Sequence, residues 1–140
     1  MNIIIMGCGR VGSELAKLLD AEGHKVTIMD IEANSFDTLP SDFGGVAFLG
    51  DATDEEMLKK AGIAQANAFI AVTSDDDKNA MAAQIAKQIF NVPKVLCRMH
   101  DPLRAEFFES LGLEAISPIF LFVQVVREKL GIGKEGPCIS

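Results

Sequence analysis

The sequence of 140 residues predicts an α/β fold, a doubly wound parallel sheet of six strands within a single domain. Three observations lead to this fold class. Short apolar runs recur along the chain, and stretches with helical features separate them. A glycine-spaced loop joins the first run to the first helix. Several runs are apolar at consecutive positions, as expected when helices cover both faces of a parallel sheet.

The first unit of the chain reads as strand, loop, helix and strand. The apolar run Asn2–Met6 leads into the loop Gly7–Gly12, whose sequence is GCGRVG. A helix-like stretch over Ser13–Glu22 and a second apolar run, Lys25–Asp30, follow. A G-x-G-x-x-G pattern in this context is typical of a Rossmann-like dinucleotide-binding unit. The alternative is a glycine-rich turn that binds no ligand.

Each position of this loop has a predicted role. Gly7 permits the tight turn after the strand, Gly9 lets a pyrophosphate approach the backbone, and Gly12 lets the helix pack closely on the sheet. The phosphates would then lie at the helix N-terminus, among unpaired N–H donors. The loop residues Cys8 and Val11 are also candidate ligand-binding positions. Arg10 opposes the helix dipole, so we expect it to contact phosphate or a partner subunit.

Asp30 ends the second strand, about 20 residues after the glycine loop. Its carboxylate is placed to accept hydrogen bonds from the 2′- and 3′-hydroxyls of an adenosine ribose. A 2′-phosphate would be repelled there, so the sequence disfavours NADP. Without a ligand, Asp30 would be an ordinary surface acid.

The remaining strands continue the alternation with helices. Right-handed crossovers and the position of the glycine loop predict the strand order 3-2-1-4-5-6. The predicted strands after the first two are Val46–Leu49, Ala68–Val72, Lys94–Met99 and Glu114–Ser117.

Helix ends are marked by capping residues. Thr53 and Ser74 stand at capping-box spacing from the acids that follow them. Asp101 and Ser117 each precede a proline suited to the first helical position. Glycines that fall just past helices, where a left-handed residue is needed, are Gly23, Gly62 and Gly112.

Polar residues end several predicted strands, at the edge where such sheets bind ligands. Asp51, or the adjacent backbone at Ala52, is placed to pair with an adenine edge, although Asp51 is equally suited to capping the next helix. Thr73 would line the opposite wall of the crevice, next to Ser74. Arg98 would serve an anion or an interface, or pair with Asp101 or Glu114.

Composition limits the partners. The formal net charge of −7 argues against binding nucleic acid or an anionic membrane surface. The longest apolar stretch is interrupted and too short to span a bilayer, and no targeting segment is visible, so we expect a cytoplasmic protein without direct membrane insertion. Three cysteines without C-x-x-C spacing and two isolated histidines predict neither disulfides nor a metal site. Cys8 is an oxidisable thiol at most, and more simply a small loop residue.

No residue pair suggests catalysis. A dehydrogenase needs a substrate domain and an acid or base facing the nicotinamide, and the sequence offers neither. We therefore expect a nucleotide sensor with no catalytic residues, not an enzyme. Two alternatives remain open: an NAD-dependent oxidoreductase fragment that lacks its substrate domain, and an assembly module whose crevice holds no ligand.

The last predicted helix, Ile119–Leu130, is apolar on all sides in its first turns. A helix that covers one sheet needs a single apolar stripe, so the second face calls for another partner, most simply a second copy of the chain. We expect a homodimer or higher ring through residues 118–130, a dimerisation helix that closes a domain of residues 1–130 before a tail of residues 131–140. The alternative is that this helix completes a monomeric core.

The order of these motifs resembles the TrkA-N domain, also called KTN or RCK, of potassium channel and transporter regulators. The resemblance runs from Met1 to about Leu130. The motifs that carry it are Gly7–Gly12, Asp30, Gly50–Thr53, Ala71–Thr73 with Asn79, Val95–Arg98 with Asp101-Pro102, Leu111–Leu113 and Ser117-Pro118.

The resemblance implies a cytoplasmic regulatory subunit that binds NAD(H) or an adenine nucleotide (ATP, ADP or AMP). Such domains dimerise and assemble into rings against a potassium-transporting membrane protein. By position, Gly7, Gly9 and Gly12 would hold phosphate, with Arg10 contacting it, and Asp30 would hold the ribose. Asp51 and Ala52 would lie at the adenine, and Thr73 would line the central cleft.

Overall fold

The computed structural model describes residues 1–132, which form one six-stranded parallel sheet. The strand order is β3-β2-β1-β4-β5-β6, so the predicted doubly wound topology is confirmed. Because the order reverses between β1 and β4, a crevice opens at the carboxyl ends of these strands. The strands are β1 Asn2–Met6, β2 Lys25–Asp30, β3 Val46–Leu49, β4 Ala68–Ala71, β5 Lys94–Arg98 and β6 Glu114–Ile116.

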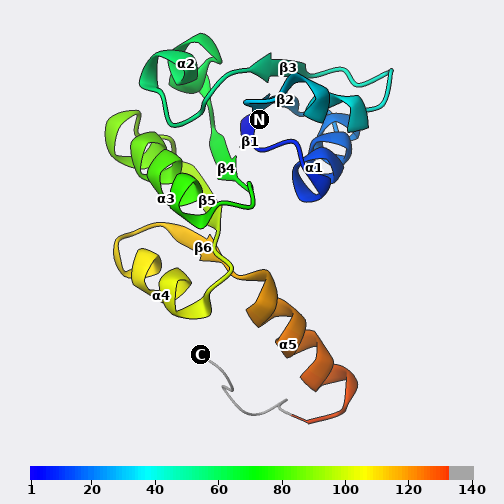
Figure 1. The fold of residues 1–140 in the computed structure, drawn as a ribbon, viewed down its shortest axis with the longest axis vertical. Coiled ribbons are helices and arrows are strands. Elements are labelled where there is room, and N and C mark those ends of the chain that lie inside the picture. The colour runs from blue at the N-terminus through cyan, green and yellow to red at the C-terminus, as the bar shows by residue number, and fades with distance from the viewer. Residues whose placement is uncertain (133–140) are drawn as a thin grey trace.

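Helices cover both faces of the sheet (Figure 1). One face carries α1 (Arg10–Ala21) and a 3₁₀ helix (Ala33–Thr38). The other face carries α2 (Glu55–Lys60), α3 (Asp76–Gln84) and α4 (Pro102–Ser110). A short 3₁₀ turn (Ile63–Gln65) follows α2, and a π-helical turn (Ile85–Ile89) follows α3.

Each face of the sheet has its own hydrophobic core, because the side chains of a strand alternate between the two faces. On β1, Ile3 and Ile5 pack toward α1, whereas Ile4 and Met6 pack toward α2 and α3. Phe69 of β4 is fully buried in the core that lies under α2 and α3. Burial on both faces accounts for the consecutive apolar residues of β1.

The last helix, α5 (Pro118–Lys129), leaves the body of the domain (Figure 1). None of its residues is buried, and Phe122 is 70% exposed. The interpretation that this helix completes a monomeric core is therefore wrong for the single chain.

Two predicted helix caps are wrong by one residue. Asp54, not Thr53, caps α2, with its side chain accepting the Glu56 N–H at 2.9 Å. Thr53 is not available because its hydroxyl donates to Asp51 at 2.7 Å. Asp75, not Ser74, caps α3, accepting the Lys78 N–H at 3.1 Å.

The other predicted helix ends are confirmed. Asp101 and Ser117 cap α4 and α5, each before a proline at the start of the helix. Positive φ values of 93°, 94° and 90° occur at Gly23, Gly62 and Gly112.

Hydrogen bonds connect the start of α3 to the turn after β5, on the face of the sheet that α2, α3 and α4 cover. The carboxylate of Asp76 accepts the His100 backbone N–H at 3.0 Å and lies 2.8 Å from His100 Nδ1. The His100 carbonyl accepts the Ser117 hydroxyl at 3.1 Å, and Ser117 caps α5. Burial alone would raise the pKa of Asp76, but the side-chain and backbone hydrogen bonds from His100 outweigh it, so the pKa is lowered overall.

This shift predicts an acid-sensitive contribution to stability. Because the pKa of Asp76 is lower in the folded chain, its stabilisation is present above the ordinary aspartate pKa of 3.8 and lost as the pH falls through the folded value. We expect Asp76→Asn to lower the free energy of unfolding by about 1–2 kcal/mol at neutral pH. Urea denaturation between about pH 5 and pH 3 should show this difference shrinking toward acid.

Asp77→Asn is the matched control. Asp77 is 83% exposed and pairs with Arg104, so its loss should change stability by less than about 1 kcal/mol. A difference between wild type and Asp76→Asn that stays constant down to pH 3 would contradict the assignment.

Candidate functional site

A cleft of about 710 Å³ lies at the carboxyl ends of the strands, where the strand order reverses. Its volume is in the range of small-molecule sites, about 300–1,000 Å³. The predicted site residues that line it are Gly7, Cys8, Gly9, Arg10, Val11, Asp30, Asp51, Ala52, Thr73 and Arg98. Gly12 alone among the predicted residues is not part of the lining.

The glycine loop is shaped by two close approaches. Gly7 has φ of +108°, and a Cβ there would lie 3.0 Å from Thr73 Cγ2. A Cβ on Gly12 would lie 1.8 Å from the Gly7 carbonyl oxygen, so only glycine lets α1 start this close to the loop. A Cβ on Gly9 would meet no atom within 4 Å, which leaves open space over the backbone there.

The N-terminus of α1 opens into this cleft. Within residues 1–132, no side chain caps the helix at Gly9, and its first residue, Arg10, is exposed. Unsatisfied N–H groups at the positive end of a helix attract anions. A guanidinium beside them adds a second, movable source of positive charge.

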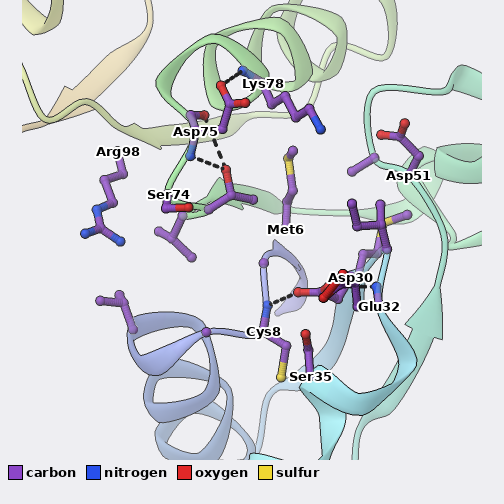
Figure 2. A pocket seen from close by; sticks show the side chains of 18 of the residues that line it. Met6, Cys8, Asp30, Glu32, Ser35, Asp51, Ser74, Asp75, Lys78 and Arg98 are labelled. Atoms are coloured by element: carbon purple, nitrogen blue, oxygen red, sulfur yellow. Dashed lines mark hydrogen bonds between the residues drawn. The ribbon is translucent and has the colours of Figure 1, made fainter.

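Asp30 connects two loops at the floor of the cleft (Figure 2). Its Oδ2 accepts the Cys8 N–H at 2.8 Å, and its Oδ1 accepts the Glu32 N–H at 2.9 Å. A carboxylate offers about four acceptor positions, so each oxygen keeps capacity for a further donor. The sequence did not predict that Asp30 would also anchor the glycine loop.

Asp51 and Ala52 form the wall after β3. Asp51 Oδ1 accepts both the N–H and the hydroxyl of Thr53, at 2.9 and 2.7 Å. These two hydrogen bonds, the side-chain one first, lower the pKa of Asp51 and keep it ionised. Asp51 thus holds the turn before α2 without being its cap, and its second oxygen stays available to the cleft.

Thr73 is held by a buried asparagine that is fully satisfied. The Asn79 side-chain oxygen accepts the N–H and the hydroxyl of Thr73, at 3.0 and 2.6 Å. Its amide donates to the carbonyls of Thr73 and Arg98, at 2.9 and 3.1 Å. Asn79 is fully buried, so these four hydrogen bonds fix the ends of β4 and β5 relative to each other.

Arg98 faces the cleft from the end of β5, far from Asp51 in Figure 2. Its Nε is buried without a hydrogen-bond partner in the described part of the chain. The two acids predicted as alternative partners are engaged elsewhere: Asp101 caps α4, and Glu114 pairs with Lys94 at 3.1 Å. This leaves the guanidinium for an anion.

In a comparison with known protein families, the TrkA-N domain matches residues 3–118 of the chain. The chain belongs to the TrkA-N domain family. The predicted resemblance is thereby confirmed over nearly the whole range that was quoted for it.

Relatives and solved structures agree with this assignment. The chain is 43% identical over 136 residues to the Trk system potassium uptake protein TrkA of Streptomyces coelicolor, covering 96% of the chain and 61% of that protein. The TrkA-N domain of the inner membrane protein YbaL from Escherichia coli has the same fold, with a TM-score of 0.82 at 21% identity, covering 92% of the chain and 96% of that domain. The AMP-bound Kef C-terminal domain of Shewanella denitrificans matches with a TM-score of 0.75 at 26% identity, over 94% of the chain and 80% of that structure.

Cys8 lies within the TrkA-N cleft, and the pKa of its thiol is raised. It is buried, and burial raises the pKa of its thiol. The contact with the Thr38 hydroxyl lowers the pKa by less than burial raises it, and the nearby Asp30 charge adds a smaller increase. Cys97 is also a free buried cysteine, and Cys138 lies outside the described residues.

Several residues of the TrkA-N cleft were not predicted. They come from the loops after β2 and β4 and from the first turn of α3, and no motif marks them in the sequence. An exposed lysine in a helix reads as a solvated surface charge until the fold shows which way it faces. The unpredicted polar residues are Glu32, Ser35, Asp75 and Lys78, whereas Ser74 lies on the wall where the sequence predicts it.

Neither a metal-binding cluster nor a membrane-spanning helix occurs in residues 1–132. No cluster of three or more His, Cys, Asp or Glu side chains suited to a metal ion occurs there. None of the helices in this range has both the length and the apolar character to cross a membrane.

Two glycines of the loop differ in the space around them, and the difference can be tested through stability. We expect Gly12→Ala to lower the free energy of unfolding by about 1–3 kcal/mol, because its Cβ would overlap the Gly7 carbonyl. Gly9→Ala should leave the free energy of unfolding within about 0.5 kcal/mol of wild type, because its Cβ enters open space. Urea denaturation measures both, and equal losses would contradict the geometry.

Proposed function

We propose that this TrkA-N domain is a cytoplasmic regulatory domain that binds NAD(H) or an adenine nucleotide and controls a potassium-transporting membrane protein. The observation that carries the proposal is the cleft at the strand ends, where an anion-attracting helix N-terminus, the Asp30 carboxylate and the Asp51 wall occur together. The chain covers 61% of its Streptomyces relative, which is named a potassium uptake protein, so the partner is inferred by analogy.

The ligand would lie across the strand ends. Its phosphates would sit against the backbone at Gly7, Gly9 and the start of α1, with Arg10 and Arg98 supplying positive charge. Its ribose hydroxyls would donate to the free acceptor positions of Asp30. The base would reach Asp51 and the buried Ala52, and Thr73 would form the opposite wall.

The charges near Asp30 disfavour NADP. Glu32 also lines the cleft, two residues beyond Asp30, so a 2′-phosphate would face two carboxylates. An adenine nucleotide with a free 2′-hydroxyl meets no such repulsion. The AMP bound by the related Kef domain supports an adenine ligand.

A regulatory role fits the cleft better than catalysis. Among the described residues, Cys8 is the thiol that lines the cleft, and its raised pKa makes it a poor nucleophile. Asp30 and Asp51 already accept hydrogen bonds from backbone N–H groups and the Thr53 hydroxyl. An oxidoreductase fragment would need an acid or base facing the nicotinamide, and no residue pair in the sequence suggests that role.

Assembly would use α5. Its exposed apolar residues include Leu121, Phe122 and Val125, and an apolar groove of about 660 Å³ lies beside it, lined by Leu103 and Phe120. A second copy would cover this surface with its own α5, which gives a homodimer. Such dimers could assemble further into a ring. Such exposed apolar area on a monomer marks an interaction surface.

Regulation would follow from a population shift. A nucleotide changes the equilibrium between two arrangements of paired domains only if it binds one arrangement more tightly. The domains of the pair would meet through α5, whose cap residue Ser117 is hydrogen-bonded to the turn after β5, next to the cleft. The ligand would thereby favour one angle between the domains.

The ribose assignment is testable by calorimetric titration with NAD⁺, NADH, AMP, ADP, ATP and NADP⁺. Asp30→Ala should weaken binding of the ribose-bearing ligands about 10- to 100-fold, because charge-assisted hydrogen bonds are lost. Since the substitution also frees the glycine loop, 2′-deoxy-AMP separates the two effects. Wild type should bind 2′-deoxy-AMP more weakly than AMP, and Asp30→Ala should bind both alike.

Asp37→Ala removes the same charge from an exposed position outside the cleft and should leave binding unchanged. Equal affinity of wild type and Asp30→Ala for AMP would refute the ribose contact.

The assembly surface is testable by sedimentation. Phe122→Glu places a charge on the most exposed aromatic residue of α5 and should convert the dimer to a monomer, since a buried interface disfavours an unpaired charge. Met81→Glu, on an exposed position of α3, is the control and should leave the dimer intact. A Phe122→Glu protein that still sediments as a dimer would exclude α5 as the interface.

A further inference from the structure

Lys78 occupies the edge of the cleft without an evident structural task. It lies in the first turn of α3, where a cation opposes the helix dipole. Its backbone N–H is used by the cap Asp75, but its ammonium forms no ion pair with any described residue. A lysine that is costly to the helix and has no partner is available to a ligand.

The Lys78 side chain extends along the cleft toward Asp51 (Figure 2). Both residues line the cleft, and they are separated by more than the 4.0 Å of an ion pair. The Lys78 charge nevertheless contributes to the lowered pKa of Asp51, after the two Thr53 hydrogen bonds. The ammonium and the carboxylate therefore face each other with room between them.

The two groups have complementary hydrogen-bonding capacity. An ionised carboxylate only accepts, and an ammonium only donates. Asp51 has used one oxygen on Thr53 and has the other free toward the cleft. A group that fits between them must present a donor beside an acceptor, which is the pattern of adenine, whose 6-amino group lies between the ring nitrogens N1 and N7.

We propose that Lys78 and Asp51 together recognise the edge of the adenine base, with Lys78 donating to a ring nitrogen next to the 6-amino group and Asp51 accepting from that amino group. This inference rests on the proposed nucleotide function and adds a specificity-determining residue to it. Lys78 distinguishes an adenine from a base with a donor at the same position.

The position of Lys78 favours the base over a phosphate as its partner. Figure 2 places Arg98 at the opposite end of the cleft from Asp51, with the glycine loop and Asp30 in between. A phosphate beside Lys78 would also lie close to the Asp51 carboxylate and be repelled by it. An uncharged base edge satisfies both groups at once.

The experiment is calorimetric titration of wild type, Lys78→Met and Lys78→Arg with AMP, ADP, ATP, 1-deaza-AMP and 7-deaza-AMP. Loss of one charged hydrogen bond should weaken AMP binding to Lys78→Met about tenfold. The loss should be the same for ADP and ATP, and Lys78→Arg should retain most of the affinity. The control Lys87→Met removes a lysine from the far end of the same helical segment, outside the cleft, and should bind like wild type.

The deaza analogues identify the contact. Wild type should bind the analogue that lacks the contacted nitrogen about tenfold more weakly than AMP, and Lys78→Met should not distinguish that analogue from AMP. A loss in Lys78→Met that grows from AMP to ATP assigns Lys78 to phosphate and overturns the inference. So does a wild type that binds both analogues as tightly as AMP.

The outcomes also separate this inference from the function on which it rests. A wild type that binds no nucleotide refutes both. A wild type that binds AMP in an Asp30-dependent way, together with unchanged affinity in Lys78→Met, refutes only the role of Lys78. Because its ammonium has no partner among the described residues and opposes the helix dipole, the ligand-free Lys78→Met protein should melt at or slightly above the wild-type temperature, which excludes misfolding as the cause of lost binding.

Discussion

Asp30 accepts backbone hydrogen bonds from the loop after β1 and from the loop after β2, and the geometry of the cleft depends on this one carboxylate. The Cys8 N–H would otherwise be a buried donor without an acceptor, and the glycine loop would lose its link to β2. The close contact between Gly7 and Gly12 then sets where α1 begins. The side chain proposed to bind ribose is therefore also the one that positions the phosphate-binding loop, so folding and binding impose the same requirement on this position.

Most of the fold could be predicted from the sequence because it follows from local patterns. The six apolar runs, the prolines after Asp101 and Ser117, and the glycines after helices each depend on a few neighbouring residues, and the strand order follows from crossover handedness. The predicted caps of α2 and α3 were wrong because aspartates one residue after Thr53 and Ser74, Asp54 and Asp75, cap these helices instead. Asp51 engages the Thr53 hydroxyl, and that contact decides which residue caps α2 without appearing in the capping pattern.

The candidate site was predictable in part. The glycine loop, Asp30, Asp51, Thr73 and Arg98 stand at strand ends, and parallel strands bring their carboxyl ends together. The other contributors depend on the rotation of a helix. Lys78 and Asn79 are adjacent in α3, yet one faces the cleft and the other is fully buried beneath it. Sequence spacing does not fix that rotation, because the acidic first turn of α3 has no apolar stripe to orient it.

The attachment of α5 has a mechanical consequence. Its cap, Ser117, is hydrogen-bonded to the His100 carbonyl, and His100 is held in turn by Asp76 at the start of α3. Beyond that attachment the helix runs for twelve residues, about 18 Å, with no buried side chain to restrain it. A tilt of about 5° at Ser117 would move the far end of the helix by about 1.6 Å. A small change of angle at this attachment would thereby become a larger displacement at the tip of the helix, on the surface proposed to meet a second copy of the chain.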